Sequence, residues 1–380
     1  MTTGILYDER FLLHRAPYEH PEHPGRLAAI HDRLEEEGLL ARCETVAARE
    51  ATREELERIH TPAHLRTIAE TAKRDFTQLD PDTYACRDSA KAALLAAGGL
   101  VDLALAVAEG RLENGLALLR PPGHHAEADR AMGFCLFNNV AVAARAAQNQ
   151  GVARAAQNQG IARAAQNQGI ARAIQAAGAA KAAPSEGVER VLIVDWDLHH
   201  GNGTQHSFWE DPTVLYFSTH QFPFYPGTGA IDEIGGGAGR GFTLNVPLPA
   251  GCGDAEYLAA FDRILLPVAR DFAPDLVLVS AGYDAADGDL LGSMRITPDG
   301  YARLTQRLLG LAGGRVVLAL EGGYNLDAIA RSAEASLRAL LGAPDDGRQE
   351  MSGDESLRPQ PAPAVSRILD AVLRARERAS

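Results

Sequence analysis

The stretch VLIVDWDLHHGNG, residues 191–203, is the most informative part of the sequence. Four uninterrupted apolar residues open it, as expected for a strand that is buried on both faces inside a parallel sheet. The strand runs directly into two carboxylates and two imidazoles, which are costly to bury unless they are paired or bind a metal. Asp197 and His199 lie two positions apart, so in extended backbone both side chains project to the same side and can share one cation. A strand end that only caps the next helix is the simpler alternative, but two carboxylates combined with two histidines favour a ligand site.

Apolar runs of the same kind recur along the chain and alternate with longer helical patterns. Strands are predicted at 4–7, 116–119, 191–195, 214–217, 242–246, 276–280 and 315–320. Helices are predicted at 25–37, 89–109, 138–149, 255–272, 298–311 and 326–341. This alternation is typical of an α/β fold, here a three-layer, open and mostly parallel sheet with helices on both faces. Ligands bind beyond the carboxyl ends of the strands in such sheets, so we expect the active site at that edge.

Polar side chains follow three more of the predicted strands. The run RPPGHH (120–125) follows the strand 116–119, SAGYD (280–284) follows 276–280, and EGGY (321–324) follows 315–320. Adjacent histidines can supply a general base and an electrostatic partner near neutral pH. A tyrosine hydroxyl can donate to an oxyanion. Gly322 and Gly323 could alternatively form a phosphate-binding loop, but no Lys or Ser/Thr follows them as in a P-loop.

The four strand ends together predict a metal-assisted hydrolase. Two carboxylates and one imidazole are suitable ligands for a catalytic zinc ion that keeps an open position. Such a zinc ion lowers the pKa of bound water and polarises a substrate carbonyl. An amide is then hydrolysed without a protein nucleophile, and the absence of a Gly-x-Ser-x-Gly elbow disfavours a serine hydrolase.

Composition excludes several other classes of function. A net charge of −13 disfavours nucleic-acid binding, which needs clustered Lys and Arg, although it could attract cationic substrates. No unbroken run of about 18 apolar residues and no pattern of a signal peptide occurs, so we expect no membrane span and a cytoplasmic location. Four scattered cysteines without a Cys-x-x-Cys pair disfavour both a disulfide framework and a thiolate zinc site: Cys43, Cys86, Cys135 and Cys252.

A nine-residue unit, ARAAQNQG followed by Val or Ile, repeats from Ala144 to about Gly178. It has too little apolar surface for a stacked solenoid, so a passive surface insertion over about 144–186 is favoured over a partner-binding segment. The insertion lies within a predicted catalytic domain at 1–342. Residues 343–380 are predicted to form a flexible linker and an amphipathic C-terminal helix at 365–379. The sequence is compatible with both a monomer and a homo-oligomer.

In kind and order, these motifs resemble those of the arginase-like deacetylase superfamily. That superfamily includes histone deacetylases, class II-like bacterial relatives and acetylpolyamine amidohydrolases. The matching stretches are 20–26, 120–125, 133–139, 195–203, 225–229, 281–288 and 321–324. The resemblance implies an arginase/deacetylase-like fold, one zinc ion per subunit and hydrolysis of an N-acetyl amide to amine and acetate.

The resemblance also implies roles for individual residues. Three side chains are implied as zinc ligands: Asp197, His199 and Asp284. Five are implied as catalytic: His124, His125, Asp195, Asn202 and Tyr324. Among them His125 is the general base and acid, His124 is its electrostatic neighbour, and Tyr324 supports the oxyanion. Asp195 pairs with His124 and Asn202 with His125, and an Asn at the latter position indicates the class II-like branch.

Two further sets of residues follow from the same resemblance. The acyl-lysine tunnel is implied to be lined by Gly133, Phe134, Tyr225 and Leu291, with ordinary core packing as the alternative for Phe134 and Leu291. A structural monovalent cation, usually potassium in relatives, is implied near Asp195, Asp197, His199 and Ser218. Asp82 falls near the rim aspartate with which relatives orient the substrate backbone.

We therefore expect a zinc-dependent deacetylase of acetyl-lysine side chains in proteins or peptides. The alternatives are a deacetylase of acetylpolyamines or other small N-acyl amines, a catalytically silent acyl-lysine binding module, and an arginase-like two-metal hydrolase. The complete ligand set and Tyr324 argue against the silent module. The histidine pair and Asn202 leave too few carboxylates for a second catalytic metal.

Overall fold

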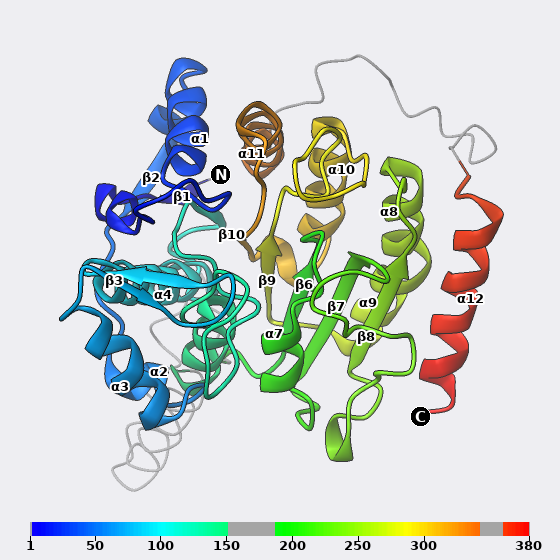
Figure 1. Ribbon diagram of the computed structural model, residues 1–380. Coiled ribbons are helices and arrows are strands. Elements are labelled where there is room, and N and C mark those ends of the chain that lie inside the picture. Colours follow the sequence, from blue (N-terminus) through cyan, green and yellow to red (C-terminus); the bar gives the residue numbers. More distant parts are fainter. Residues whose placement is uncertain (1, 151–186, 343–359, 380) are drawn as a thin grey trace, which may run out of the picture.

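The computed structural model describes residues 2–150, 187–342 and 360–379. Its centre is an eight-stranded sheet in which every pair of neighbouring strands is parallel (Figure 1). In sheet order the strands are β2 (Cys43–Val46), β1 (Thr3–Leu6), β5 (Asn114–Ala117), β10 (Val316–Leu320), β9 (Leu276–Ala281), β6 (Val191–Asp195), β7 (Val214–Gln221) and β8 (Thr243–Leu248). Every predicted strand overlaps one of these, and the predicted α/β class is confirmed.

Helices surround this sheet, and each predicted helix has a counterpart among them. Their bounds are α1 (Gly25–Glu36), α2 (Arg53–Leu56), α3 (Pro62–Thr71), α4 (Ser89–Ala108), α7 (Asn202–Ser207), α8 (Asp254–Ala260), α9 (Leu266–Phe272), α10 (Pro298–Leu309), α11 (Leu326–Leu340) and α12 (Pro363–Glu377). Residues 139–150 are also helical. The single helix predicted at 255–272 contains a π-helical turn, Phe261–Leu265, between α8 and α9. Pro267, which has no N–H to donate, follows that turn. A separate hairpin pairs β3 (Phe76–Gln78) with β4 (Tyr84–Cys86).

Helices cover both faces of the sheet, as the alternation of side chains along β1 shows. Thr3 Oγ1 donates a hydrogen bond to the carbonyl of Leu340 in α11, at 3.4 Å. The next residue, Gly4, faces the other way, and a Cβ added there would lie 2.7 Å from Leu103 Cδ1 in α4. Since neighbouring residues of a strand point to opposite faces, α11 and α4 lie on opposite sides of the sheet. The Leu103 and Leu112 side chains leave little room for a Cβ at position 4.

Helix α4 has the length and composition of a membrane-crossing helix, because Lys91 and Asp102 interrupt its apolar residues only twice. Within the most apolar 18-residue stretch of this helix, 83% is nevertheless buried inside the protein. Among the described helices, only α4 is long and apolar enough to cross a membrane. A buried core helix of a large α/β domain can have the same length and composition. Its apolar character is accounted for by packing against the sheet.

The predicted C-terminal helix is confirmed as α12. Its apolar side chains Val365, Leu369 and Val372 are buried and belong to the main hydrophobic core. The Arg263 guanidinium donates to Asp370 of α12 at 2.6 Å. The helix therefore docks beside β8 at the edge of the sheet (Figure 1). Most of the linker predicted before it, residues 343–359, lies outside the described residues.

The chain is held together near the two ends of the predicted insertion. Gln148 Nε2 donates to the carbonyl of Glu189 at 2.9 Å and to Thr213 Oγ1 at 2.9 Å. The backbone N–H groups of Glu189 and Arg190 in turn donate to the Asp275 carboxylate. Residues 148 and 189 therefore meet just before β6 begins. Most of the repeats, at 151–186, lie outside the described residues.

Candidate active site

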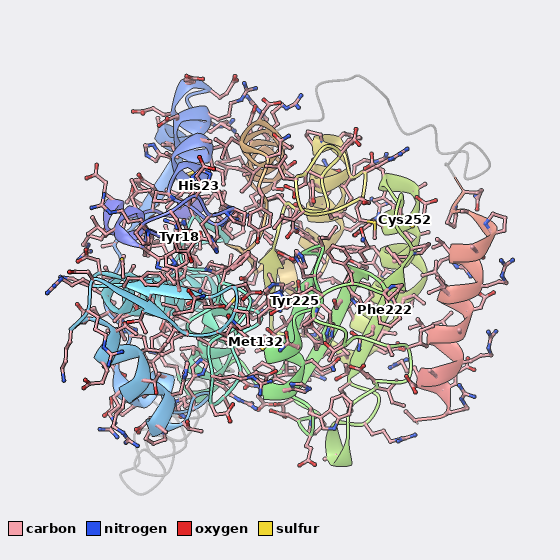
Figure 2. The ribbon with its side chains drawn as sticks, in the orientation of Figure 1. Tyr18, His23, Met132, Phe222, Tyr225 and Cys252 are labelled. Carbon is pink, nitrogen blue, oxygen red and sulfur yellow. The ribbon has the colours of Figure 1, made fainter. Side chains whose placement is uncertain are left out.

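The polar runs identified in the sequence meet because their strands are neighbours. Strands β5, β10, β9 and β6 are consecutive in the sheet, so the residues after their carboxyl ends lie at one edge. Figure 2 shows Tyr225 with Met132 in the region where these loops meet. A cavity of about 90 Å³ opens there, lined by Asp82, Pro122, His124, His125, Gly133, Phe134, His199, Tyr225, Leu291, Gly322 and Tyr324. All four predicted tunnel residues are among them.

The three predicted metal ligands lie together beside this cavity. Ligand atoms of Asp197, His199 and Asp284 all lie within 4.8 Å of one another, and all three residues are buried. His199 Nδ1 is 3.1 Å from Asp197 Oδ1 and 3.1 Å from Asp284 Oδ2. Burial and the charge of Asp197 raise the pKa of Asp284, because two carboxylates are crowded together. A divalent cation relieves such crowding, so these residues fit a zinc ion.

A second set of potential ligand atoms lies close by but is occupied with hydrogen bonds. It consists of His124, Cys135 and Glu321. Glu321 accepts from the backbone N–H of Gly123 at 2.6 Å and from Ser280 Oγ at 3.2 Å. Burial and the charge of Glu321 raise the pKa of the Cys135 thiol well above its usual value, so it stays protonated. Glu321 thereby supports the loop that carries His124 and His125.

The two adjacent histidines have opposite electrostatic environments, although their ring centres are 4.0 Å apart. His124 Nδ1 lies 3.1 Å from Asp195 Oδ2. Burial lowers the pKa of His124, but the charges of Asp197 and Asp195 raise it overall, to about 10. His125 Nδ1 instead faces the neutral amide of Asn202, with Oδ1 at 2.8 Å. Burial and the charge of His124 hold the pKa of His125 well below its usual value, so one ring is a cation and the other a neutral base.

Tyr324 projects into the cavity from the loop after β10. Its hydroxyl makes no hydrogen bond within the described part of the chain, while its backbone N–H donates to Asp289 at 2.6 Å. Burial raises the pKa of Tyr324 well above its usual value, so the hydroxyl remains a donor. Gly323 before it has φ +121°, which favours glycine, and an added Cβ would lie 2.9 Å from Ile329.

The tunnel walls are fixed by contacts with the histidine loop. A Cβ added to Gly133 would lie 2.4 Å from His125 Cδ2, so glycine lets the backbone lie against the imidazole. The Tyr225 and His125 rings meet edge to face with centres 5.2 Å apart. The backbone N–H of Phe134 donates to Thr83 Oγ1, which donates to the Asp82 carboxylate. Asp82 thus lies at the cavity beside Phe134, as its sequence position suggested.

The sequence assigned no role to a buried ion network behind Tyr324. Glu22 accepts hydrogen bonds from Arg26 at 3.1 Å and from Arg120 at 2.8 Å, and His14 Nε2 lies 3.4 Å from it. Burial raises the pKa of Glu22, but the charge of Arg120 outweighs it and keeps the pKa well below the usual value. The runs 20–26 and 120–125 were noted as motifs, yet the pairing between them joins residues 98 positions apart. No local pattern in the sequence indicates such a pairing.

Two more residues near the site were missed, Glu127 and His206. Asn202 Nδ2 donates to Glu127 Oε1 at 2.6 Å, and His206 Nδ1 lies 2.9 Å from the same oxygen. Glu127 is only two positions beyond the histidine pair in the sequence, which is the one signal that pointed to it.

The predicted potassium ligands are only partly adjacent. Ser218 pairs with Asp195 across β7 and β6, so these two residues lie side by side. The Ser218 hydroxyl shares a hydrogen bond with His220 Nδ1 at 2.9 Å. The side chains of Asp197 and His199 belong to the candidate zinc site described above. A potassium site here stays a prediction.

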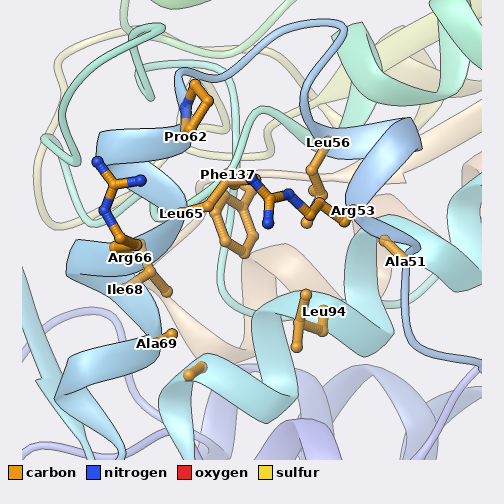
Figure 3. A pocket seen from close by; sticks show the side chains of 11 residues that line it. Ala51, Arg53, Leu56, Pro62, Leu65, Arg66, Ile68, Ala69, Leu94 and Phe137 are labelled. Atoms are coloured by element: carbon orange, nitrogen blue, oxygen red, sulfur yellow. The ribbon is translucent and has the colours of Figure 1, made fainter.

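A larger and mostly apolar cavity, of about 350 Å³, lies between α2, α3 and α4. Figure 3 shows Arg53 extending from α2 toward Phe137 across this cavity. Phe137 follows the loop that carries Phe134, so the cavity borders the back of that loop.

An α/β sheet with candidate metal ligands, a neutral histidine and a tyrosine at one carboxyl edge defines a protein with a candidate hydrolytic centre. Residues 20–156 and 167–340 match the histone deacetylase domain model. The chain belongs to the histone deacetylase family, and the resemblance predicted from its motifs is confirmed.

Two plant proteins and one human protein are among the relatives that the chain matches. Histone deacetylase 15 of Arabidopsis thaliana is 46% identical over 351 residues, covering 90% of this chain and 57% of the relative. Histone deacetylase 5 of the same plant is 44% identical over 354 residues, covering 89% and 49%. Human histone deacetylase 7 is 40% identical over 410 residues, covering 98% and 39%. The chain therefore spans about half the length of the curated relatives it matches. The crystal structure of the HDA15 HD domain superposes with a TM-score of 0.83 at 42% identity, covering 99% of this chain and 94% of that one.

Proposed function

We propose that this protein is a zinc-dependent deacetylase that hydrolyses the N-acetyl amide of acetyl-lysine side chains in proteins or peptides to amine and acetate. One observation carries the proposal: the cavity that Phe134 and Tyr225 line is also lined by His125, His199 and Tyr324. Membership of the histone deacetylase family supports it.

Asp197, His199 and Asp284 would hold the zinc ion. When bound, zinc would polarise the acyl carbonyl and lower the pKa of water at the same place. The buried carboxylate pair, which is crowded without a cation, supports this choice of site.

The remaining steps belong to the side chains around it. His125 is neutral, so its ring can take the proton of the attacking water and later give it to the leaving amine. Tyr324 donates its hydroxyl hydrogen to the oxygen that becomes negative. His124 stays protonated and adds a positive charge next to that region. Tyr225, whose ring meets His125 edge to face, and Phe134 would enclose the aliphatic part of the acyl-lysine. A potassium ion beside Asp195 and Ser218 is proposed as a structural partner.

A substrate panel tests this function. Acetate release is measured from acetyl-lysine peptides and from acetylpolyamines, before and after chelation and again after zinc is added back. We expect cleavage of the peptides that is lost on chelation and restored by zinc. Faster cleavage of acetylpolyamines would move the assignment to small amines. Binding of acetyl-lysine without any acetate release would identify a silent binding module and overturn the proposal.

A further inference from the structure

The amide of Asn202 has only one orientation that satisfies its surroundings. Its Nδ2 side meets Glu127 Oε1 at 2.6 Å and the carbonyl of His125 at 3.4 Å. An ionised carboxylate and a backbone carbonyl can only accept hydrogen bonds, so the NH₂ group must face them. The amide oxygen then faces His125 Nδ1, at 2.8 Å. A flipped amide would place its oxygen against two acceptors.

This orientation decides where the proton of His125 lies. An amide oxygen only accepts, so Nδ1 must carry the hydrogen, and in a neutral imidazole Nε2 is then unprotonated. His125 Nε2 makes no hydrogen bond within the described residues, and the ring lines the cavity. The proton-accepting nitrogen is therefore the one available to a substrate. A free imidazole has no such constraint.

Glu127 is held in place from the solvent side. His206 Nδ1 lies 2.9 Å from Oε1 and 3.1 Å from Oε2, and Arg130 is 3.9 Å from Oε1. Burial raises the pKa of Glu127, but the hydrogen bonds from His206 and Asn202 lower it below its usual value overall, so it is ionised. His206 itself is half-exposed, whereas Glu127 is buried.

We propose that Glu127, anchored by His206, is a positioning residue that fixes the Asn202 amide and thereby keeps the lone pair of His125 on Nε2. The proposal rests on the proposed role of His125 as the base. The contrast with His124 supports it: that ring meets the Asp195 carboxylate, whose two oxygens are both acceptors, so either orientation of the partner keeps a hydrogen on His124 Nδ1.

A double-mutant cycle tests the proposal. Glu127→Leu keeps the side-chain volume but cannot accept a hydrogen bond. In the natural background we expect kcat to fall about tenfold while KM changes less than about twofold. In an Asn202→Asp background we expect Glu127→Leu to cost less than about twofold, because a carboxylate accepts from His125 in either orientation. Glu127→Gln, which keeps one acceptor, should recover part of kcat.

Glu334→Leu is the matched control. Glu334 is also a buried carboxylate held by arginines, Arg33 and Arg338, but it lies in α11 away from the cavity. We expect this variant to lower stability and leave kcat unchanged. An equal loss of kcat from Glu127→Leu in both backgrounds would mean that Glu127 only supports the fold, and the proposal would be wrong.

Nitrogen-15 NMR of the histidine rings gives a readout that needs no turnover. The His125 signal is identified by its loss in His125→Ala, using the full chain as purified. We expect the Nδ1–H tautomer in the natural protein and a mixture with the Nε2–H tautomer in Glu127→Leu. An Nε2–H tautomer in the natural protein would overturn the proposal. A protein that shows Nδ1–H yet cleaves no acetyl amide would instead refute the proposed function.

Discussion

The guanidinium carbon of Arg26 lies 4.9 Å from the centre of the Tyr324 ring. The same side chain donates to the carbonyls of Gly323 and Glu321 and pairs with Glu22. It therefore holds both the ring and the backbone of the loop that carries the proposed oxyanion donor. Arg26 is completely buried, so its charge depends on these partners.

Arg26→Met should weaken both the fold and the site. Glu22 keeps Arg120 but loses one buried partner, so we expect the free energy of unfolding to fall by about 3 kcal/mol. The freed Tyr324 loop should also lower kcat more than it raises KM. Urea unfolding and steady-state kinetics measure the two effects. A variant with reduced stability but normal kcat would show that Arg26 does not position Tyr324.

Tyr324→Phe removes a single hydroxyl group. If that group stabilises the oxyanion, kcat should fall by about 10² to 10³ with little change in KM. Stability should be unchanged, since the hydroxyl makes no hydrogen bond within the described residues. Retained turnover would sink the role given to Tyr324.

His125→Ala removes the proposed base. We expect a loss of about 10² to 10⁴ in kcat. Zinc content, measured on the same preparation, should stay as in the natural protein, because the proposed ligands are other residues. A normal kcat, or a loss of zinc that parallels the loss of activity, would contradict the assignment.

His60 should make the fold sensitive to mild acid. Its Nδ1 bonds the carbonyl of Glu127 and its Nε2 accepts from the N–H of Asn138, so the folded state has no place for a second proton. Burial and the nearby His64 lower the pKa of His60 to about 3. The unfolded chain takes up that proton below about pH 6.5, so stability should fall as the pH drops from about 6.5 to 3 and level off below.

The expected slope from His60 alone is at most about 1.4 kcal/mol per pH unit within that window. Urea unfolding at pH 7, 6 and 5 measures it. His60→Gln should be less stable at pH 7 but show a flatter pH dependence. His31→Gln, at a partly exposed position, is the control for the loss of one histidine.

Replacing residues 151–186 by a short glycine-serine linker should leave the site intact. Gln148 and Glu189 already hold the two ends together. Loop closure costs about 0.6 kcal/mol for each doubling of length, so the shortened protein should be as stable or slightly more stable. Acetate release and thermal unfolding check this. Loss of activity with unchanged stability would assign the repeats a direct part in function.

Strands β10, β9 and β6 at the centre of the sheet were predictable because each contains at least four consecutive apolar residues. Strand β2, with the sequence CETV, was missed because it lies at the edge of the sheet, where its two middle residues are exposed. The β3–β4 hairpin was missed because each strand has only three residues. Such short segments carry too few side chains for a pattern to emerge.

The residues of the candidate site likewise separate into those that the sequence predicted and those that it missed. Residues that follow apolar strands, such as Asp197, Asp284 and Tyr324, were predicted as site residues from their position, and the structure places them around one cavity or beside it. Glu22 and Glu127 were given no role, because their importance comes from hydrogen bonds to residues far along the chain. Spacing in a sequence indicates which groups share a strand end, but not which buried carboxylate orients a neighbour.

The clasp between Gln148 and Glu189 lies just before β6 begins, whereas the proposed chemistry lies after that strand ends. Insertions are therefore easier to accommodate at the amino edge of the sheet than at the carboxyl edge. At the amino edge, a nine-residue unit inserted between residues 148 and 189 leaves and rejoins the described part of the chain away from the candidate catalytic residues. The carboxyl edge carries the candidate site, so the amino edge is the natural place to graft a tag, a sensor or a second domain onto this protein.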